Sequence, residues 1–155
     1  MAASEAVPYA KTGGLADVVT ALAMELSKSG HRVTLVLPGY RGQAAQNARR
    51  VAMRFSILVV GTKTEVTVEE EFVRVTEASH PLRVFLVRYD PYFDRPGLYQ
   101  EDHQDYPDNL ERFTLFCRAV LHVLRILTEV QGEEVDVLHL HDWQTALCSV
   151  YLKAL

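Results

Sequence analysis

A cationic side chain and two adjacent glycines stand directly before an amphipathic helical pattern. Lys11 is followed by Thr12, Gly13 and Gly14, and apolar residues recur at helical spacing from Leu15 onward. Glycines let a backbone approach a ligand closely, and free N–H groups at a helix N-terminus attract anions. Lys11 can add a formal positive charge at the same place. The glycines alone favour a plain turn before a surface helix, whereas the longer run that contains them favours a binding site.

A second group of polar side chains follows a short apolar run late in the sequence. Residues 136–141 predict a buried strand, and a helix is expected to begin at Asp142. Polar residues at the carboxyl end of a parallel strand lie where open α/β sheets bind ligands. His139 and His141 share one face of such a strand while Asp142 points elsewhere, so a metal site is the weaker interpretation and we expect none. His139 is predicted to be a buried, hydrogen-bonded core residue.

The elements that position these groups follow the outline of a βαβ unit. Apolar spacing predicts a helix over residues 14–29, with Gly30 as its C′ residue. The β-branched run 31–38, closed by a proline, predicts a buried parallel strand. Met1–Ala3 is too short for the buried strand that normally precedes a Gly-rich turn. We therefore expect the chain to be truncated or misassigned at this end, without most of a central strand.

The middle of the sequence predicts strands with one solvated face. Three short runs have strand-like patterns, at residues 51–61, 63–68 and 71–77. The acidic run Glu69–Glu71 between the last two is interpreted as a solvated turn. Residues 82–88 are a further candidate for a buried strand.

A long polar connection and a strongly amphipathic helix come next. Residues 90–107 are rich in Asp, Pro, Gly and Tyr, and connections of this length are often functional. The apolar pattern after them predicts a helix that ends near Val130. Asp108 is its expected N-cap, with Glu111 at capping-box spacing.

Composition narrows the class of protein. The 155 residues suit one domain, and an apolar content of 48% is enough for a substantial core. A net charge of −4 gives no indication of binding to nucleic acid or to an anionic membrane surface. No apolar run approaches the roughly 20 residues that span a bilayer, and no secretory signal is visible. Cys117 and Cys148 fall in apolar helical patterns and are expected to be buried, reduced thiols of a cytosolic protein.

Three stretches together resemble one enzyme family. The first reads SEAVPYAKTGGLADVV from Ser4 to Val19, and it closely resembles the N-terminal signature of bacterial glycogen synthases and plant starch synthases. The second, Tyr106–Phe113, is similar to the family pattern Tyr-x-Asp-Asn-x-x-Arg-Phe. The third, Val137–Trp143, is similar to Val-x-His-x-His-Asp-Trp. Residues 94–99 also resemble the family's loop near the active-site cleft.

The resemblance implies a fold and an activity. These enzymes are retaining glucosyltransferases that use ADP-glucose to extend an α-1,4-glucan such as glycogen, starch or a maltooligosaccharide, and we expect no cofactor. Their GT-B fold has two Rossmann-like domains with the active site in the cleft between them. Residues 1–155 would form an α/β, Rossmann-like N-terminal domain, incomplete at both ends and lacking the Arg, Lys and Glu of the second domain. We therefore expect this chain alone to be catalytically inactive. The expected location of the protein is a bacterial cytoplasm or a plastid.

The resemblance also implies roles for individual residues. Lys11, Gly13 and Gly14 would lie against the sugar nucleotide, and Asp142 would hold the donor sugar as the catalytic residue. Asp17 is a candidate contact to the nucleotide or the acceptor, although the helix dipole equally favours an acid in a first turn. Further candidates for the cleft and its acceptor side are Tyr99, Asp108, Asn109 and His141. Capping of the following helix explains Asp108 equally well.

Two other classes of protein remain open. A non-catalytic module that binds a nucleotide or a glucan would keep half of the cleft and would bind ADP without transferring glucose. A dehydrogenase-like nucleotide-binding protein fits less well, because the sequence lacks a Gly-x-Gly-x-x-Gly turn. It also has Leu37-Pro38 where an acidic residue would close the next strand. The preference for ADP-glucose over UDP-glucose follows from the resemblance alone.

Overall fold

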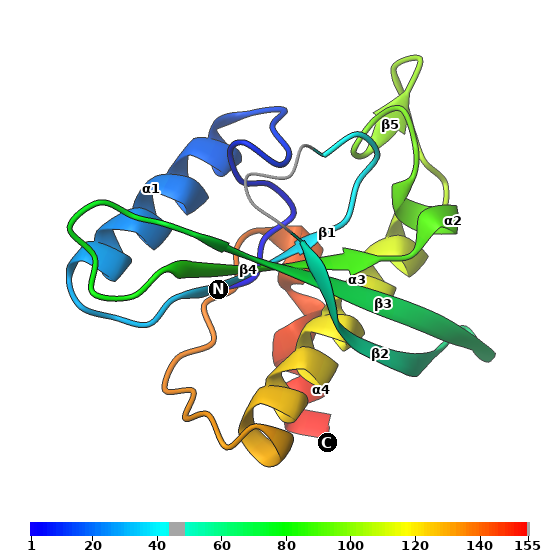
Figure 1. Ribbon diagram of the computed structural model, residues 1–155. Coiled ribbons are helices and arrows are strands. Elements are labelled where there is room, and N and C mark those ends of the chain that lie inside the picture. The colour runs from blue at the N-terminus through cyan, green and yellow to red at the C-terminus, as the bar shows by residue number, and fades with distance from the viewer. Residues whose placement is uncertain (44–48, 155) are drawn as a thin grey trace.

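A mixed four-stranded sheet with helices on both faces forms the centre of the computed structural model, which describes residues 1–43 and 49–154 (Figure 1). The strands are β1 (Thr34–Pro38), β2 (Arg50–Val59), β3 (Thr62–Val73) and β4 (Leu82–Arg88), in the order β1-β4-β3-β2. The helices are α1 (Gly14–Lys28), the short α2 (Asp90–Phe93), α3 (Asn109–Arg125) and α4 (Leu147–Ala154). A small hairpin, β5 (Gln100–Glu101) with β6 (Gln104–Asp105), projects from the connection between α2 and α3.

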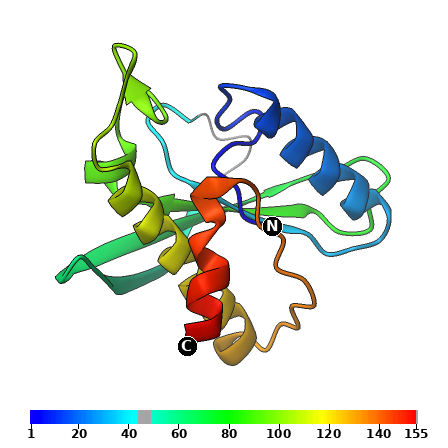
Figure 2. The ribbon, with the colours of Figure 1, turned by 180° about the vertical axis from the view of Figure 1, so that it is seen from behind.

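β4 is buried on both faces, because helices cover the sheet from both sides. Successive residues of a strand point to opposite faces. Leu86 accordingly belongs to the apolar cluster that contains Val19 of α1, whereas Phe85 belongs to the cluster that contains Phe116 of α3. Figures 1 and 2 show α1 on one side of the sheet and α3 with α4 on the other. This two-sided burial explains the continuous apolar run, and the strand predicted at 82–88 is confirmed.

The predicted βαβ outline is present. The helix expected over 14–29 is α1, and Gly30 takes a positive φ of 91°, as a C′ glycine does. β1 covers most of the predicted strand 31–38 and pairs in parallel with β4. α3 continues through a π-helical turn at Ile126–Val130, so this helix ends where its apolar pattern ends.

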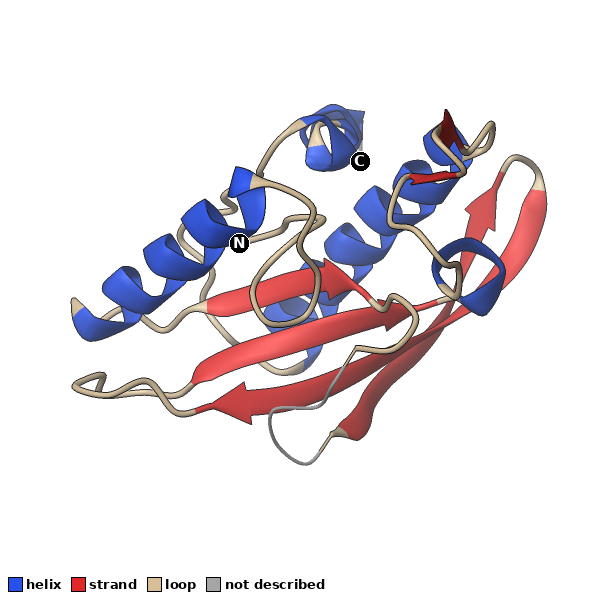
Figure 3. Cartoon of the chain, turned by 90° about the horizontal axis from the view of Figure 1, so that it is seen from above, coloured by secondary structure: helices blue, strands red, loops and turns tan. Residues whose placement is uncertain are grey.

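Met1–Ala3 lies between β1 and the segment that follows α3. Ala2 is bridged in parallel to Val36 on one side and to Leu140 on the other, and backbone hydrogen bonds hold it from both sides. Of the strand predicted at 136–141, only Leu140 forms a bridge among the described residues, so that prediction is wrong for most of its length. A regular strand needs successive paired residues, and Ala2 offers this segment a single bridge. Figure 3 shows the four regular strands side by side.

The acidic run Glu69–Glu71 lies inside β3, and its prediction as a solvated turn is wrong. β3 runs without interruption between β2 and β4. Glu71 is buried, and its carboxylate accepts hydrogen bonds from the Arg49 Nε at 2.8 Å and from the Tyr9 hydroxyl. Partners from distant segments thus supply the donors that a buried carboxylate needs. No local feature of the sequence reveals that pairing.

Two further expectations concern the thiols and the membrane. Cys117 on α3 and Cys148 on α4 are free and buried, as predicted. The Cys117 Sγ donates to the Gln144 carbonyl at 3.2 Å. In the part of the chain that the structure describes, no helix has the length and apolar character needed to cross a membrane.

The Glu71 carboxylate is expected to contribute strongly to stability. Glu71→Gln keeps the size of the side chain but removes the charge that faces Arg49. Breaking a buried ion pair from one side costs about 3 kcal/mol, so the free energy of unfolding should fall by about that amount. Glu65→Gln, at an exposed position of the same strand, is the matched control. Chemical denaturation measures both variants, and equal midpoints would show that the Glu71 charge adds nothing.

Candidate functional site

The loop before α1 leaves one side open. α1 begins at Gly14, and its N-cap residue Gly13 provides no side chain to cap the helix. Neither glycine takes a positive φ, but a Cβ placed on either would meet nothing within 4 Å. Packing therefore does not require these glycines, and they keep the N–H groups of the first helical turn accessible. An anion can approach these groups, which carry the positive end of the helix dipole.

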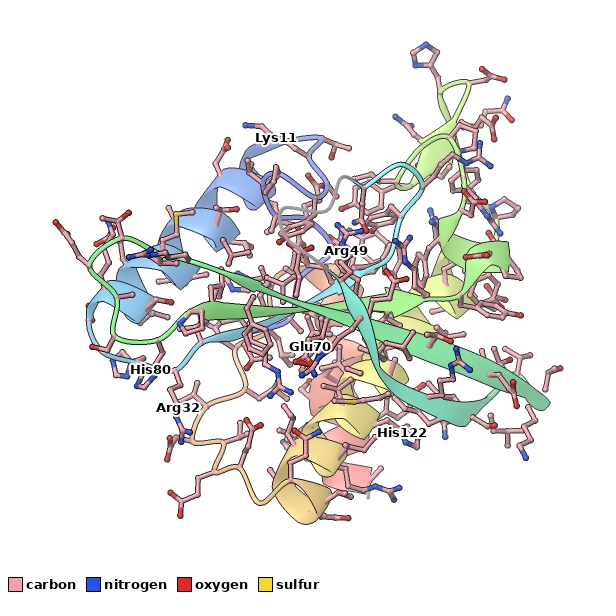
Figure 4. The ribbon with its side chains drawn as sticks, in the orientation of Figure 1. Lys11, Arg32, Arg49, Glu70, His80 and His122 are labelled. Carbon is pink, nitrogen blue, oxygen red and sulfur yellow. The ribbon has the colours of Figure 1, made fainter. Side chains whose placement is uncertain are left out.

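Lys11 and Asp17 meet beside the start of α1. The Lys11 Nζ lies 2.5 and 2.7 Å from the two carboxylate oxygens of Asp17. The two side chains are 52% and 57% exposed, and exposed pairs of this kind contribute only about 0–1 kcal/mol. Figure 4 shows Lys11 at the outer rim of the molecule. An incoming phosphate group can therefore replace Asp17 as the partner of Lys11 at little cost.

Glu5, to which the sequence motifs assign no role, organises the inner side of this loop. Its carboxylate accepts from the Thr12 N–H at 2.6 Å, from the Thr12 hydroxyl at 2.7 Å and from the Gly13 N–H at 3.3 Å. The Tyr99 hydroxyl donates to the same carboxylate at 2.7 Å. Burial raises the pKa of Glu5, but the hydrogen bonds from Thr12 and Tyr99 outweigh it and hold the pKa below its usual value. The role of Glu5 depends on a contact with Tyr99, 94 positions away, which no local pattern in the sequence indicates.

Tyr99 is brought to this loop by the connection between α2 and α3. Its hydroxyl gives its proton to Glu5, so the Ser4 hydroxyl, 2.7 Å away, donates to Tyr99 in turn. The Tyr99 ring packs against Phe113 and Trp143, with ring centroids 5.8 and 6.3 Å apart. Burial and the Glu5 hydrogen bond raise the pKa of Tyr99, which keeps this hydroxyl protonated. In Figures 1 and 2 the loop before α1 and the β5–β6 hairpin lie toward the same end of the molecule.

A buried arginine holds the connection that carries Tyr99. Arg112 is fully buried, and its guanidinium donates to the carbonyls of Tyr92 and Leu98 at 2.8 and 2.9 Å. It also donates to the Asn109 Oδ1 at 2.6 Å, and the Asn109 amide donates to the Tyr99 carbonyl at 2.9 Å. The cleft candidate Asn109 therefore links Arg112 to the backbone of Tyr99.

Asp108 occupies the N-cap position of α3 but does not cap the helix with its side chain. Its carboxylate accepts two charge-assisted hydrogen bonds from Arg95, at 2.5 and 2.7 Å. These bonds lower the pKa of Asp108. The expected side-chain capping is thus wrong, because a charged donor from the preceding loop is a stronger partner than a backbone N–H. Asp108 ties that loop to the start of α3.

Asp142 stands in a strained turn after the 136–141 segment. Its φ of 62° and ψ of −177° lie in a region that is almost restricted to glycine. The Asp142 carboxylate is exposed and accepts from the Trp143 N–H at 2.7 Å. Trp143 is 52% exposed and packs edge-on against Phe113, with 5.1 Å between centroids. Asp142 therefore adjoins the aromatic group that includes Tyr99.

His139 and His141 share one face of their segment, as predicted, and their rings stack 4.2 Å apart. His139 is exposed, so its prediction as a buried core residue is wrong. His141 is the buried member of the pair, and its Nε2 has no hydrogen-bond partner among the described residues. Burial and the neighbouring His139 lower the pKa of His141. Residues 1–43 and 49–154 contain no group of three or more His, Cys, Asp or Glu side chains that could hold a metal.

Comparisons with known proteins identify the family of the chain. The family model described as the starch synthase catalytic domain matches residues 1–155. The chain is 41% identical to the glycogen synthase of Opitutus terrae over 97% of its own length, and 42% identical to that of Elusimicrobium minutum over 99%. A solved structure of the catalytic domain of starch synthase IV from Arabidopsis thaliana, bound to ADP and acarbose, matches with a TM-score of 0.75 at 29% identity. That match covers 96% of this chain and 28% of the other.

The fold and the comparisons together define part of a GT-B glycosyltransferase catalytic domain, with the Rossmann-like α/β architecture that was expected. The chain belongs to the starch synthase catalytic domain family, and the curated relatives that it resembles are glycogen synthases. It spans about 30% of the length of those relatives. The activity of a whole enzyme therefore depends on more than the residues described above.

Backbone strain at Asp142 predicts an unusual order of stabilities. Alanine normally gives the more stable protein, because glycine loses more conformational freedom on folding. Only glycine adopts the Asp142 conformation without strain, so Asp142→Gly should be about 1–2 kcal/mol more stable than Asp142→Ala. Asp17 on α1 is the control position, where Asp17→Ala should be more stable than Asp17→Gly by about 1 kcal/mol. Thermal unfolding measures both differences, and the same order at the two positions would argue against strain at Asp142.

Proposed function

We propose that this chain supplies the donor-binding side of a glycogen or starch synthase, which transfers glucose from ADP-glucose to the non-reducing end of an α-1,4-glucan. The observation that carries the proposal is the uncapped start of α1, with Lys11 beside it and Tyr99 tied to the same loop. Membership of the starch synthase catalytic domain family supports it. So does the similar starch synthase IV structure, which was solved with ADP and acarbose.

The proposed transfer breaks the bond between the anomeric carbon and the diphosphate, and it forms a bond to the terminal 4-hydroxyl of the glucan. The electron pair of the broken bond leaves with ADP, and the proton of the acceptor hydroxyl passes to the departing diphosphate. Positive groups aimed at the departing diphosphate stabilise this transition state. Lys11 and the first-turn N–H groups from Gly14 onward supply them, while the N–H of Gly13 is directed to Glu5. Arrival of the diphosphate opens the Lys11–Asp17 pair.

The sugar side of the site depends on the turn after the 136–141 segment. Asp142 holds hydroxyl groups of the donor sugar, which orients the anomeric carbon for attack by the acceptor. Tyr99 and Trp143 offer aromatic surface on the acceptor side of the same region. Because the chain spans about 30% of its relatives, we expect it to bind ADP without transferring glucose by itself. The bacterial relatives favour a bacterial cytoplasm as the location.

A chimeric enzyme tests the proposed activity directly. Residues 1–155 replace the matching stretch of the Opitutus terrae glycogen synthase, to which they are 41% identical. We expect the chimera to extend a maltooligosaccharide with glucose from ADP-glucose, and the isolated chain to release no ADP above background. A folded chimera that binds ADP but transfers nothing would favour a non-catalytic binding module instead. A folded chimera that binds neither ADP nor maltooligosaccharide would contradict both functions.

Lys11 is expected to bind the donor through its charge. In the chimera, Lys11→Ala should raise the KM for ADP-glucose about tenfold or more, because a charge-assisted hydrogen bond to phosphate is lost. Lys28→Ala, at the opposite end of α1, removes the same side chain from a position away from the loop and serves as the control. Initial rates at varied ADP-glucose measure the effect. An unchanged KM together with an unchanged kcat in Lys11→Ala would remove Lys11 from the site.

A further inference from the structure

We infer that Glu5 is a positioning residue, which holds the loop before α1 and the connection that carries Tyr99 in a single arrangement. The Glu5 side chain is 3% exposed and lies between these two segments. It faces the inner side of the loop, away from the Lys11–Asp17 pair, so it acts on a ligand through the residues that it holds. The predicted effect of Glu5 on the affinity for ADP rests on the proposed function, whereas its effect on the positions of the two segments does not.

The Glu5 carboxylate is saturated with donors. Oε1 accepts from the Thr12 hydroxyl and from the Tyr99 hydroxyl, both at 2.7 Å. Oε2 accepts from the N–H of Thr12 at 2.6 Å and from that of Gly13 at 3.3 Å. An ionised carboxylate has about four acceptor positions, and all are used. A glutamine cannot replace it, because its NH₂ group would face donors in place of one acceptor oxygen.

These contacts decide which backbone groups a ligand can reach. The N–H groups of Thr12 and Gly13 point inward to Glu5, so Gly14 is the first residue of the loop whose N–H is left for an anion. The same carboxylate holds the Tyr99 hydroxyl, which fixes the tyrosine beside the loop. Glu5 thereby sets the distance between the donor-binding loop and the Tyr99 connection.

A variant of nearly equal size separates this role from a purely structural one. Glu5→Gln should weaken ADP binding to the 155-residue chain about tenfold, because hydrogen bonds to a charged group are lost and the loop is no longer fixed. Glu101→Gln changes an exposed glutamate of the β5–β6 hairpin and is the matched control. If Glu5 served stability alone, Glu5→Gln would lower the unfolding midpoint and leave the ADP affinity of the folded protein unchanged. ADP titration by calorimetry and chemical denaturation together distinguish the two roles.

A double-mutant cycle tests the link between the two segments. Tyr99→Phe removes only the hydroxyl, so after Glu5→Gln it should have little further effect on ADP affinity, because the hydrogen bond that the two residues share has already lost its charged acceptor. The Tyr89 hydroxyl lies outside the Glu5 network, so the effect of Tyr89→Phe on ADP affinity should add to that of Glu5→Gln. Trp143 is the only tryptophan of the chain and lies 6.3 Å from the Tyr99 ring, so its fluorescence reports the position of the connection. Glu5→Gln and Tyr99→Phe should shift its emission in the same direction, and Tyr89→Phe should not.

The outcomes keep this role separate from the proposed function. If the unaltered chain binds no ADP, the proposed function fails. The role of Glu5 is then decided by the Trp143 emission and by the unfolding free energies of Glu5→Gln, Tyr99→Phe and the double variant. Additive effects of Glu5→Gln and Tyr99→Phe, with unshifted Trp143 emission, would overturn the inference. If Glu5→Gln does not fold, Thr12→Val takes its place in the cycle, since it removes one donor to the carboxylate and keeps the shape of the side chain.

Discussion

Carboxylates that leave water must find donors, and this requirement holds the candidate site loop from both of its ends. Glu71 of β3 accepts from the Tyr9 hydroxyl, and Glu5 accepts from the N–H and hydroxyl of Thr12. Tyr9 and Thr12 flank Lys11 in the chain, so Lys11 lies on a short span with a buried acid at each end. A buried carboxylate without donors costs several kcal/mol, so the Tyr9 end of this span cannot shift independently of β3, nor the Thr12 end independently of Glu5.

The parts of the fold that could be predicted are those whose signal is local. Helix α1 and the strand at 82–88 follow from the spacing of apolar residues, because each buries faces that the sequence itself marks. The prediction for the acidic run in β3 was wrong because three adjacent acids are ordinarily exposed to solvent. Here arginines from other segments and the Tyr9 hydroxyl make burial of Glu70 and Glu71 possible. The strand predicted at 136–141 was wrong for a related reason, since a strand forms only where residues from elsewhere in the chain pair with it.

In the candidate site, too, residues with a local signal could be predicted from the sequence and residues defined by distant contacts could not. Resemblance singled out Lys11 and the two glycines, and the structure places them at the open start of α1 with Asp17 as the partner of Lys11. Glu5 could not be selected in this way, because its role consists of contacts to Thr12 and to a tyrosine 94 positions away. Asp108 carried a local capping signal, and a distant arginine overrode it. Motifs thus select candidate ligand-binding groups more readily than the residues that hold those groups in place.

The strengths of two ion pairs support the proposed exchange of partners at Lys11. In the Glu71–Arg49 pair the Glu71 side chain is fully buried, and removing its partner leaves a buried charge without compensation at a cost of about 3–5 kcal/mol. Lys11 with Asp17 is about half exposed, and such a pair is worth about 0–1 kcal/mol. A diphosphate can displace the second kind of pair but not the first. In the proposed function, the weak Lys11–Asp17 pair stands where a diphosphate has to compete, whereas the buried Glu71 carboxylate holds the Tyr9 end of the loop.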